Sequence, residues 1–351
     1  MDPLRILRVW GARFAPAARQ EEVLAMKAVV CEKPGDESVL RIGEAPDPAA
    51  GPGQLLIRVK YAGLNRADVM QRQGFYPPPP GASKIIGLEC AGEVAAVGAG
   101  VGGWRVGERA MALLAGGGYA ELAAVDAGSA MKIPAALSDV EGAAFPEVFI
   151  TAFLNIFMLA GAQPGESVLV HGGGSGVGTA SILLCKEAGV RSIVTAGSDA
   201  KCEQCLKLGA DVAINYNSGP FPAAVKTATS GRGADIILDS IGAVYLGQNL
   251  DALAHSGRLV LIGLMKGART EIDLTGVLRR HLKVMGSTLR TRPEKEKAAI
   301  VAALLERFGA ALEAGRLRPP IYKAVPMADA ARAHRMMAAS EHFGKIVLHI
   351  A

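Results

Sequence analysis

The sequence predicts an α/β protein that combines a β-rich region with a doubly wound parallel sheet. Short strand-like runs separated by Gly and Pro fill roughly residues 26–130, which is typical of an all-β unit. After Pro146 the period of the hydrophobic pattern lengthens. Continuous apolar runs alternate there with helical stretches. A strand that is covered on both faces shows no polar alternation, so this second region predicts a parallel sheet between two helical layers.

The expected elements follow in chain order. The β-rich region holds predicted strands at residues 26–33, 54–63, 92–98, 108–113 and 119–125. A buried helix at 148–162 precedes further predicted strands at 167–171, 192–198, 211–216, 234–242, 257–265 and 281–289. Helices are predicted between the first three of these strands, at 179–189 and 199–210. The chain ends in two predicted helices and a strand, at 294–315, 328–339 and 345–350.

Composition bounds the class of protein. The chain has 351 residues, 50% of them hydrophobic and 20% charged, which suits about two well-packed domains. Aromatic residues make up only 5% and the net charge of +5 is scattered, so no nucleic-acid partner is expected. No apolar run reaches the length of about 20 residues that spans a bilayer, so no membrane partner is expected either. An odd number of cysteines, five, with no secretory signal, is typical of reduced thiols, and a cytoplasmic protein is predicted.

Residues 1–25 differ from the rest of the chain. They are rich in arginine, as a mitochondrial presequence is, but they lack serine and contain Asp2, Glu21 and Glu22. We therefore expect a disordered or non-native leader before a second start at Met26, with a mitochondrial presequence as the alternative.

The segment HGGGSGVG, at residues 171–178, directly follows a predicted strand and precedes a predicted helix. In this context a glycine-rich loop binds a dinucleotide, with the pyrophosphate at the N-terminus of the helix. No register gives a strict G-x-G-x-x-G, because Ser175 stands where the middle glycine belongs. We expect backbone amides and the Ser175 hydroxyl to bind the cofactor phosphates. The predicted cofactor-binding residues of the loop are Gly173, Gly174, Ser175, Gly176, Val177 and Gly178.

The end of the second predicted parallel strand discriminates between NAD and NADP. An NAD site places a carboxylate there to bind the ribose hydroxyls, whereas an NADP site replaces it with donors for a phosphate. Here Gly197 and Ser198 end the strand, Lys201 lies in the next helix, and Tyr216 ends the third strand. We interpret Asp199 as the N-cap of that helix, which turns its carboxylate away from the ribose. NADPH is therefore the predicted cofactor.

Residues 26–351 resemble the zinc-free quinone oxidoreductases of the medium-chain dehydrogenase/reductase superfamily. The segments that carry the resemblance are GLNRADVMQRQGFYPPPPGAS (63–83), GLECAG (87–92), PEVFITAF (146–153), HGGGSGVGTA (171–180), GADVAINY (209–216), GLMKG (263–267) and FGKIVL (343–348). The first of these is specific, whereas the glycine loop alone is not. The nearest subgroup is similar to the tumour-suppressor-inducible quinone oxidoreductase of vertebrates.

The resemblance implies a GroES-like catalytic domain formed by residues 26–146 and 287–351. A Rossmann domain that binds NADPH, residues 147–286, is inserted between these two parts. Zinc-dependent relatives place ligands near the positions of Asn65 and Leu88, and neither residue binds zinc tightly, so no metal is expected. Further cofactor contacts are implied on the far side of the cleft, at Gly263, Leu264, Ser287 and Thr288.

Asn65 and Tyr76 are the predicted catalytic residues. The Asn65 amide can donate to an oxygen that gains negative charge, although a structural role is an equal alternative. Tyr76 precedes a stiff run of prolines and is expected to cover the nicotinamide, with packing of a turn as the alternative. Arg66 and Asp68 are expected to form a structural ion pair with helix-capping duties, with a polar site shared with Asn65 as the alternative. His171 ends a strand, and we expect it to be a packed core residue rather than a base.

The sequence thus predicts an NADPH-dependent quinone oxidoreductase that transfers hydride without a metal. An enoyl or enone reductase is the alternative enzyme, because an activated C=C bond accepts hydride in the same geometry. A weakly catalytic dinucleotide-binding protein, of the crystallin or RNA-binding kind, is the alternative outside enzymes. A homodimer is expected, because the strand at 281–289 falls last in the parallel sheet and an apolar edge needs to be covered.

Overall fold

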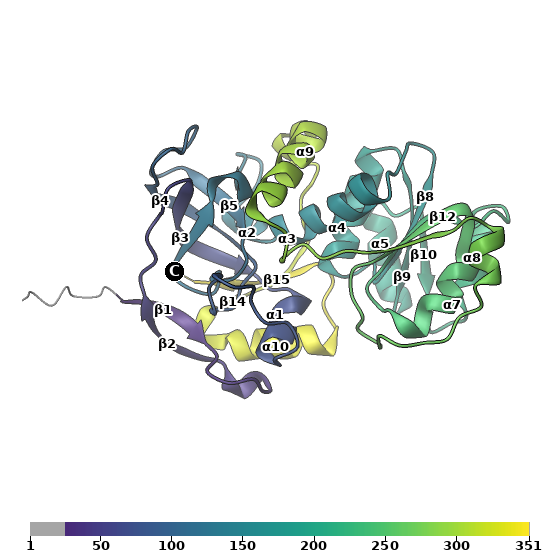
Figure 1. Ribbon diagram of the computed structural model, residues 1–351, viewed down its shortest axis with the longest axis horizontal. Coiled ribbons are helices and arrows are strands. Elements are labelled where there is room, and N and C mark those ends of the chain that lie inside the picture. Colours follow the sequence, from purple (N-terminus) through teal and green to yellow (C-terminus); the bar gives the residue numbers. More distant parts are fainter. Residues whose placement is uncertain (1–24, 351) are drawn as a thin grey trace, which may run out of the picture.

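The structure contains two large β-sheets, each with its own helices, that are joined by a helical core (Figure 1). It is a computed structural model that describes residues 25–350. The predicted leader therefore lies outside the described residues, except for Ala25, which begins β1 (Ala25–Val30). The predicted α/β fold class, a β-rich domain together with a doubly wound parallel sheet, is confirmed.

The β-rich sheet is built from both ends of the chain. Its strand order is β14-β15-β3-β4-β5-β7, with β6 paired to β3. β15 runs antiparallel to β3, and Val347 lies opposite Gly63. A separate antiparallel pair is formed by β1 and β2 (Arg41–Pro46). The bounds of the other strands are β3 (Gln54–Gly63), β4 (Glu89–Val97), β5 (Arg109–Leu113), β6 (Leu122–Asp126), β7 (Ala130–Lys132), β14 (Ile321–Pro326) and β15 (Lys345–His349).

The second sheet has six parallel strands in the order β10-β9-β8-β11-β12-β13. The chain runs outward from β8 to β10 and then returns to β11, so the strand order reverses beside β8. Such a switch point leaves a crevice outside the carboxyl ends of the strands, where ligands bind. The bounds are β8 (Ser167–His171), β9 (Arg191–Ala196), β10 (Val212–Asn215), β11 (Ala234–Asp239), β12 (Leu253–Leu261) and β13 (Lys283–Gly286).

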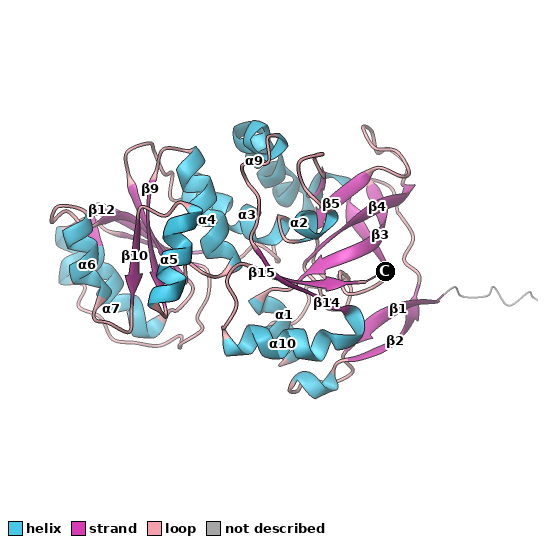
Figure 2. Cartoon of the chain, turned by 180° about the vertical axis from the view of Figure 1, so that it is seen from behind, coloured by secondary structure: helices cyan, strands magenta, loops and turns pink. Residues whose placement is uncertain are grey.

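Successive residues of β8 pack on opposite faces of this sheet. Val168 and Val170 belong to the apolar cluster that contains α4 (Gly176–Glu187), whereas Leu169 packs with Phe221 of α6 (Phe221–Ala228). Both faces are therefore covered, as the continuous apolar runs predict. Figure 2 shows α4 beside α5 (Asp199–Leu208) along one face. The remaining helices of this part are α7 (Ala243–Ala252) and α8 (Thr275–Arg279).

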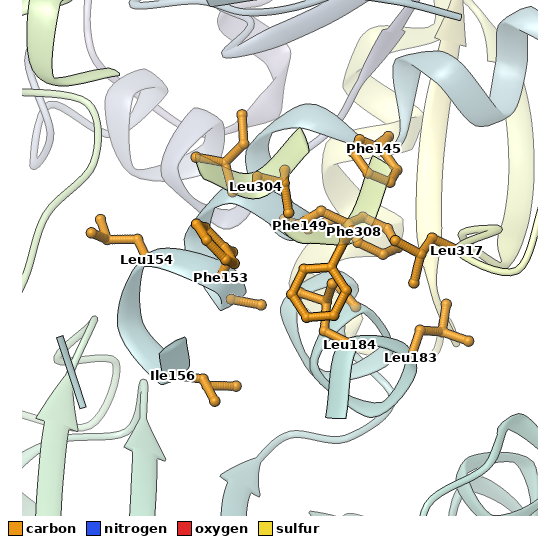
Figure 3. Packing of buried hydrophobic residues seen from close by; sticks show 14 of the residues in the cluster. Phe145, Phe149, Phe153, Leu154, Ile156, Leu183, Leu184, Leu304, Phe308 and Leu317 are labelled. Carbon is orange, nitrogen blue, oxygen red and sulfur yellow. The ribbon is translucent and has the colours of Figure 1, made fainter. Parts of the chain in front are cut away.

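A cluster of aromatic and aliphatic side chains joins the two parts of the molecule (Figure 3). Phe145 and Phe149 stack with their ring centroids 4.0 Å apart, and Phe153 meets Phe308 edge-to-face at 6.0 Å. These rings lie on or next to α3 (Pro146–Phe153) and α9 (Glu294–Glu313), which pack against α4. Because the cluster contains side chains from both parts, its close packing fixes the position of one wall of the crevice relative to the other.

The predicted helix at 148–162 is only partly right. The α-helix ends at Phe153 and continues as a π-helical turn, η3 (Leu154–Leu159). Asn155 Nδ2 donates to the Thr151 carbonyl oxygen at 2.7 Å, and such a side-chain bond competes with the regular backbone pattern. No helix among residues 25–350 is long and apolar enough to cross a bilayer. The remaining elements are α1 (Arg66–Arg72), α2 (Asp139–Ala143), α10 (Ala330–Ala339), η1 (Glu37–Val39), η2 (Ala127–Ser129) and η4 (Met327–Asp329).

Candidate active site

A cleft of about 340 Å³ opens at the carboxyl ends of β8 and β9, and its walls come from both parts of the molecule. Half of the predicted site residues line it, namely Asn65, Gly174, Ser175, Gly176, Val177, Gly197, Lys201 and Tyr216. The other half lie outside its lining, namely Tyr76, Gly173, Gly178, Ser198, Gly263, Leu264, Ser287 and Thr288.

The glycine-rich loop turns tightly into α4. Ser175 is the N-cap of this helix, and its Oγ accepts a hydrogen bond from the Gly178 N–H at 3.0 Å. A Cβ at Gly178 would lie 2.3 Å from the Gly172 carbonyl oxygen, and one at Gly176 would lie 2.7 Å from the Lys345 side chain. The position of Gly178 therefore requires glycine, because the clash is with the backbone, whereas a side chain at Gly176 would displace that of Lys345. The exposed Ser175 and the first amides of α4 face the cleft, which is the arrangement that binds a pyrophosphate.

The prediction that Asp199 caps α5 is wrong. Ser198 is the N-cap, and its Oγ accepts from the Lys201 N–H at 3.3 Å. Asp199 is the first residue of the helix, where a carboxylate is favoured by the helix dipole, and its Oδ1 accepts from Asn215 Nδ2 at 2.8 Å. Ser198 precedes Asp199 and already has the extended conformation of a cap, so it takes that place.

The end of β9 forms the part of the cleft where the predicted adenosine ribose would lie. Lys201 and Tyr216 both line the cleft there. Gly197 makes room for the Tyr216 phenol, because a Cβ at Gly197 would lie 2.5 Å from its oxygen. The Lys201 ammonium donates to the Ser340 carbonyl oxygen at the end of α10. An ammonium group and a phenol at this position can both donate hydrogen bonds to a phosphate on the ribose.

The amide of Asn65 is held from two sides at the other end of the cleft. Its Nδ2 donates to Glu89 Oε1 at 2.8 Å, and its Oδ1 accepts from the Lys345 ammonium at 2.6 Å. Asn65 is 8% exposed, so both bonds are shielded from water. The orientation of the amide is fixed, and one of its two N–H groups is left for a ligand.

Lys345, which lines the cleft, and Glu89, which binds it, are two buried charged residues that the sequence analysis does not single out. Lys345 also donates to the Leu64 carbonyl oxygen at 2.9 Å and to Glu89 Oε1 at 2.6 Å, so its three protons are all engaged. The side chains of Lys345 and Glu89 are 2% and 0% exposed. A charged residue inside an apolar strand is rarely buried without a partner, and this signal is present in the segments FGKIVL and GLECAG.

The predicted ion pair between Arg66 and Asp68 is wrong. The Arg66 guanidinium donates instead to the Met337 carbonyl oxygen at 2.8 Å, at the end of α10. Asp68 Oδ2 accepts from the Asn65 N–H at 2.7 Å and from the Tyr119 hydroxyl at 3.2 Å, so its helix-capping role is confirmed. Asp68 is fully buried, and this burial raises its pKa to about 7.

Glu147 is a second acid with a raised pKa that the sequence analysis does not single out, and its side chain is half-buried. It lies at the start of α3, next to Val148, which lines the cleft. Its backbone N–H donates to Glu89 Oε2 at 2.9 Å. Burial, followed by the charges of Glu89 and Asp68, raises the pKa of Glu147 to about 8. Behind the lining of the cleft, two acids, Asp68 and Glu147, therefore titrate near neutral pH instead of near pH 4.

Tyr76 lies outside the lining of the cleft, half-buried beside Arg290. Burial, followed by the charge of Glu147, raises the pKa of its phenol. On the far side, the Ser287 hydroxyl is buried with no hydrogen-bond partner among residues 25–350, and the Thr288 hydroxyl lies 2.8 Å from that of Thr291. Near Gly263 and Leu264, the cleft itself is lined by Ile262, Met265 and Lys266.

His171 is a packed core residue, as predicted. Its Nε2 lies 2.7 Å from Asn249 Oδ1, its Nδ1 lies 3.1 Å from Thr195 Oγ1, and the side chain is 3% exposed. Burial lowers the pKa of His171 to about 4. The imidazole is therefore neutral, although one edge of it lines the cleft.

Two family models match the chain. Residues 51–135 match the alcohol dehydrogenase GroES-like domain, and residues 176–306 match a zinc-binding dehydrogenase. The residues present do not fit the zinc ion that the second description names. The Asn65 amide is engaged by Lys345 and Glu89, and Leu88 is apolar and 1% exposed. No group of three His, Cys, Asp or Glu residues in the described part of the chain could hold a metal ion.

The chain is 32% identical over 323 residues to a phenolphthiocerol/phthiocerol polyketide synthase protein of Mycobacterium tuberculosis. This match covers 91% of the chain but spans only 14% of the length of that relative. The synaptic vesicle membrane protein VAT-1 homolog of Mus musculus is 31% identical over 329 residues, which is 89% of this chain and 80% of the mouse protein.

Three solved structures share the whole arrangement. An NAD-dependent alcohol dehydrogenase is 32% identical, with a TM-score of 0.79, and a mycobacterial quinone oxidoreductase is 30% identical, with a TM-score of 0.79. A mycobacterial protein in complex with NADPH is 29% identical, with a TM-score of 0.80. Each likeness covers 93% of this chain and 100% of the other. The two family models and the near full-length match to the mouse protein show that the chain belongs to the medium-chain dehydrogenase/reductase superfamily.

Proposed function

We propose that this oxidoreductase reduces quinones with NADPH and needs no metal. The observation that carries the proposal is one cleft that joins the glycine-rich loop to the fixed amide of Asn65. The likeness to a mycobacterial quinone oxidoreductase and to a mycobacterial protein in complex with NADPH supports it. Within the superfamily we place the chain near the tumour-suppressor-inducible quinone oxidoreductase of vertebrates, on the segment 63–83.

Bound NADPH would supply the hydride, and the protein holds the two reactants. The first amides of α4 and the Ser175 hydroxyl bind the pyrophosphate, while Lys201 and Tyr216 bind the 2′-phosphate. The free N–H of Asn65 donates to the acceptor oxygen, which gains negative charge as the hydride arrives. Tyr76, which does not line the cleft itself, would cover the nicotinamide and the acceptor from outside that lining. Because quinones are readily reduced, holding the acceptor at the right distance provides much of the rate enhancement.

Reduction of an activated C=C bond conjugated to a carbonyl is the second candidate. The similarity to the mycobacterial polyketide synthase favours it. The same amide of Asn65 would donate to the enone oxygen, so the two candidates share one site and differ in the atom that receives the hydride.

Steady-state oxidation of NADPH and NADH against ortho-quinones, para-quinones and enones tests the proposal. We expect the highest kcat/KM with NADPH and a quinone, and we expect treatment with a chelator to leave it unchanged. A higher kcat/KM with enones would favour the second candidate. Activity that a chelator removes and zinc restores would contradict the metal-free site. Tight NADPH binding without turnover of any acceptor would favour a dinucleotide-binding protein.

A further inference from the structure

Three basic side chains from different elements lie close to one another at the wall of the cleft. Lys201 comes from α5, Arg66 from α1, and His342 from the segment between α10 and β15, and all three line the cleft. Carbonyl groups at the end of α10 hold the first two, since Lys201 donates to Ser340 and Arg66 donates to Met337. Each cation is fixed at the wall and keeps further N–H groups for a ligand.

His342 is the member of this cluster whose hydrogen bonding is incomplete. Its side chain is 7% exposed, and its buried Nδ1 has no hydrogen-bond partner among residues 25–350. Burial, followed by the charges of Lys201, Arg66 and Lys345, lowers the pKa of His342 to about 4, although the backbone carbonyl group of Met336 acts in the opposite direction. The ring is therefore neutral without a ligand. Buried polar atoms are seldom left unpaired, so this nitrogen indicates a missing partner at the wall of the cleft.

Positively charged side chains lie on several sides of His342 and create a positive electrostatic field at its ring. Glu341, the adjacent carboxylate, is exposed to solvent. An anion with two charges would oppose this field and stabilise the imidazolium. The other titratable groups that face His342 are Lys201 of α5, Arg66 of α1, Lys345 of β15 and the phenol of Tyr322 in β14, whose ring centroid lies 6.3 Å away.

We propose that His342 is a further binding residue for the 2′-phosphate of NADPH and that it takes up one proton from solvent when this phosphate binds. The inference rests on the proposed use of NADPH. In the neutral tautomer that carries its proton on Nε2, Nδ1 presents a lone pair, which repels a phosphate oxygen, whereas the protonated ring donates a charge-assisted hydrogen bond from Nδ1. NADH has no 2′-phosphate, so its binding takes up no proton at His342. This residue thus links the choice of cofactor to pH.

Isothermal titration calorimetry of the full chain tests this inference, in buffers of different ionisation enthalpy at about pH 7.5. A free phosphate monoester has its second pKa near 6, so the cofactor itself exchanges few protons at that pH. We expect proton uptake with NADPH and none with NADH. Uptake also makes NADPH binding weaken as the pH rises through the pKa of His342 in the complex.

His342→Gln should abolish the uptake and lower the affinity for NADPH by about 10- to 100-fold near neutral pH, with the affinity for NADH unchanged. His255→Gln is the control, since His255 is exposed and does not line the cleft. Preferred binding of NADPH without proton uptake would overturn the inference and leave the proposed cofactor intact. Equal affinity for NADPH and NADH would instead contradict the proposed cofactor, and the inference with it.

A direct titration avoids the risk that the variant fails to fold. The imidazole signals of His342 in the wild-type protein, followed by NMR, should show the pKa rising from about 4 without ligand to above neutral in the complex with NADP⁺. A pKa that stays the same on binding would overturn the inference.

Discussion

The guanidinium of Arg290 lies over the ring of Tyr76, 5.3 Å from the ring centroid, and fixes the segment that carries it. Arg290 Nη1 donates to the Tyr76 carbonyl oxygen at 3.1 Å, and Nη2 donates to Gln71 Oε1 at 2.7 Å. Its Nε donates to the Ala115 carbonyl oxygen at 2.8 Å, and the side chain is 3% exposed. These bonds use the planar, forked shape of arginine, which lysine does not have.

Arg290→Lys should therefore loosen the segment around Tyr76 while keeping the charge. We expect the KM for the acceptor and the Kd for NADPH to rise together, each by about tenfold (a loss of about 1.4 kcal/mol), as we expect for Tyr76→Ala. The double variant should raise the KM for the acceptor and the Kd for NADPH little more than Tyr76→Ala alone, because both substitutions disturb the same segment. Arg292→Lys is the control, since Arg292 pairs with Glu296. Fully additive losses in the double variant would contradict this role of Arg290.

A helix or strand can be predicted from the sequence when the pattern of its own side chains determines its conformation. The strand predicted at 54–63 is found as β3 with the same bounds. β14 (Ile321–Pro326) is not predicted, because Val325 is its only fully buried residue and the strand depends on pairing with β15. Strands of this kind are specified by the neighbouring strand rather than by their own pattern.

The same distinction applies to the site. The glycine-rich loop is predicted because its function depends on a local order of strand, loop and helix. The partners of Asn65 are not predicted, because Lys345 is 280 residues away in sequence. A hydrogen bond of this kind exists only once β15 has paired with β3, so no local pattern reveals it. The cofactor and substrate, the homodimer and the domain boundaries remain predictions from the sequence.

Lys201→Ala should weaken NADPH binding and spare NADH. A charge-assisted hydrogen bond to the 2′-phosphate contributes about 1.5–3 kcal/mol, so the Kd for NADPH should rise about 10- to 100-fold. Fluorescence titration with each cofactor measures this difference. Lys207→Ala is the matched control on the same helix, because the Lys207 side chain is 79% exposed. Equal affinity of the wild-type protein for both cofactors would refute the assignment of Lys201.

Asp68→Asn should change how stability depends on pH. Burial raises the pKa of Asp68 from 3.8 to about 7 in the folded protein. Because this pKa is raised in the folded protein, the free energy of unfolding is highest below about pH 4 and falls as the pH rises from there through about 7. The total decrease is on the order of 4 kcal/mol. Thermal unfolding of both proteins from pH 4 to pH 8 should therefore show the wild type losing more stability than the variant. Parallel curves would show that the Asp68 carboxyl does not titrate in this range.

We propose a homodimer that pairs the edges of the two parallel sheets. β13 is the edge strand, and Val284 on it is 44% exposed, while Leu278 of α8, the helix that precedes it in the chain, is 78% exposed. An apolar edge is stabilised when a second copy covers it. Val284→Lys should give a monomer in sedimentation velocity at micromolar concentration, whereas Val106→Lys, at an exposed site beside the other sheet, should not. A monomeric wild-type protein would contradict the proposal.

Asn65→Ala should lower turnover far more than it weakens NADPH binding. The variant removes the one free N–H that can stabilise the acceptor oxygen, and losing such a donor lowers kcat by about 100-fold or more. It also leaves Lys345 and Glu89 each without one partner, so the thermal stability should fall as well. Asn155→Ala separates the two effects, because Asn155 is 2% exposed and its amide bonds only to the backbone of α3. Both variants should unfold at lower temperature, but only Asn65→Ala should lose turnover with quinones at saturating NADPH. Wild-type turnover in Asn65→Ala would show that this amide only holds the buried lysine in place.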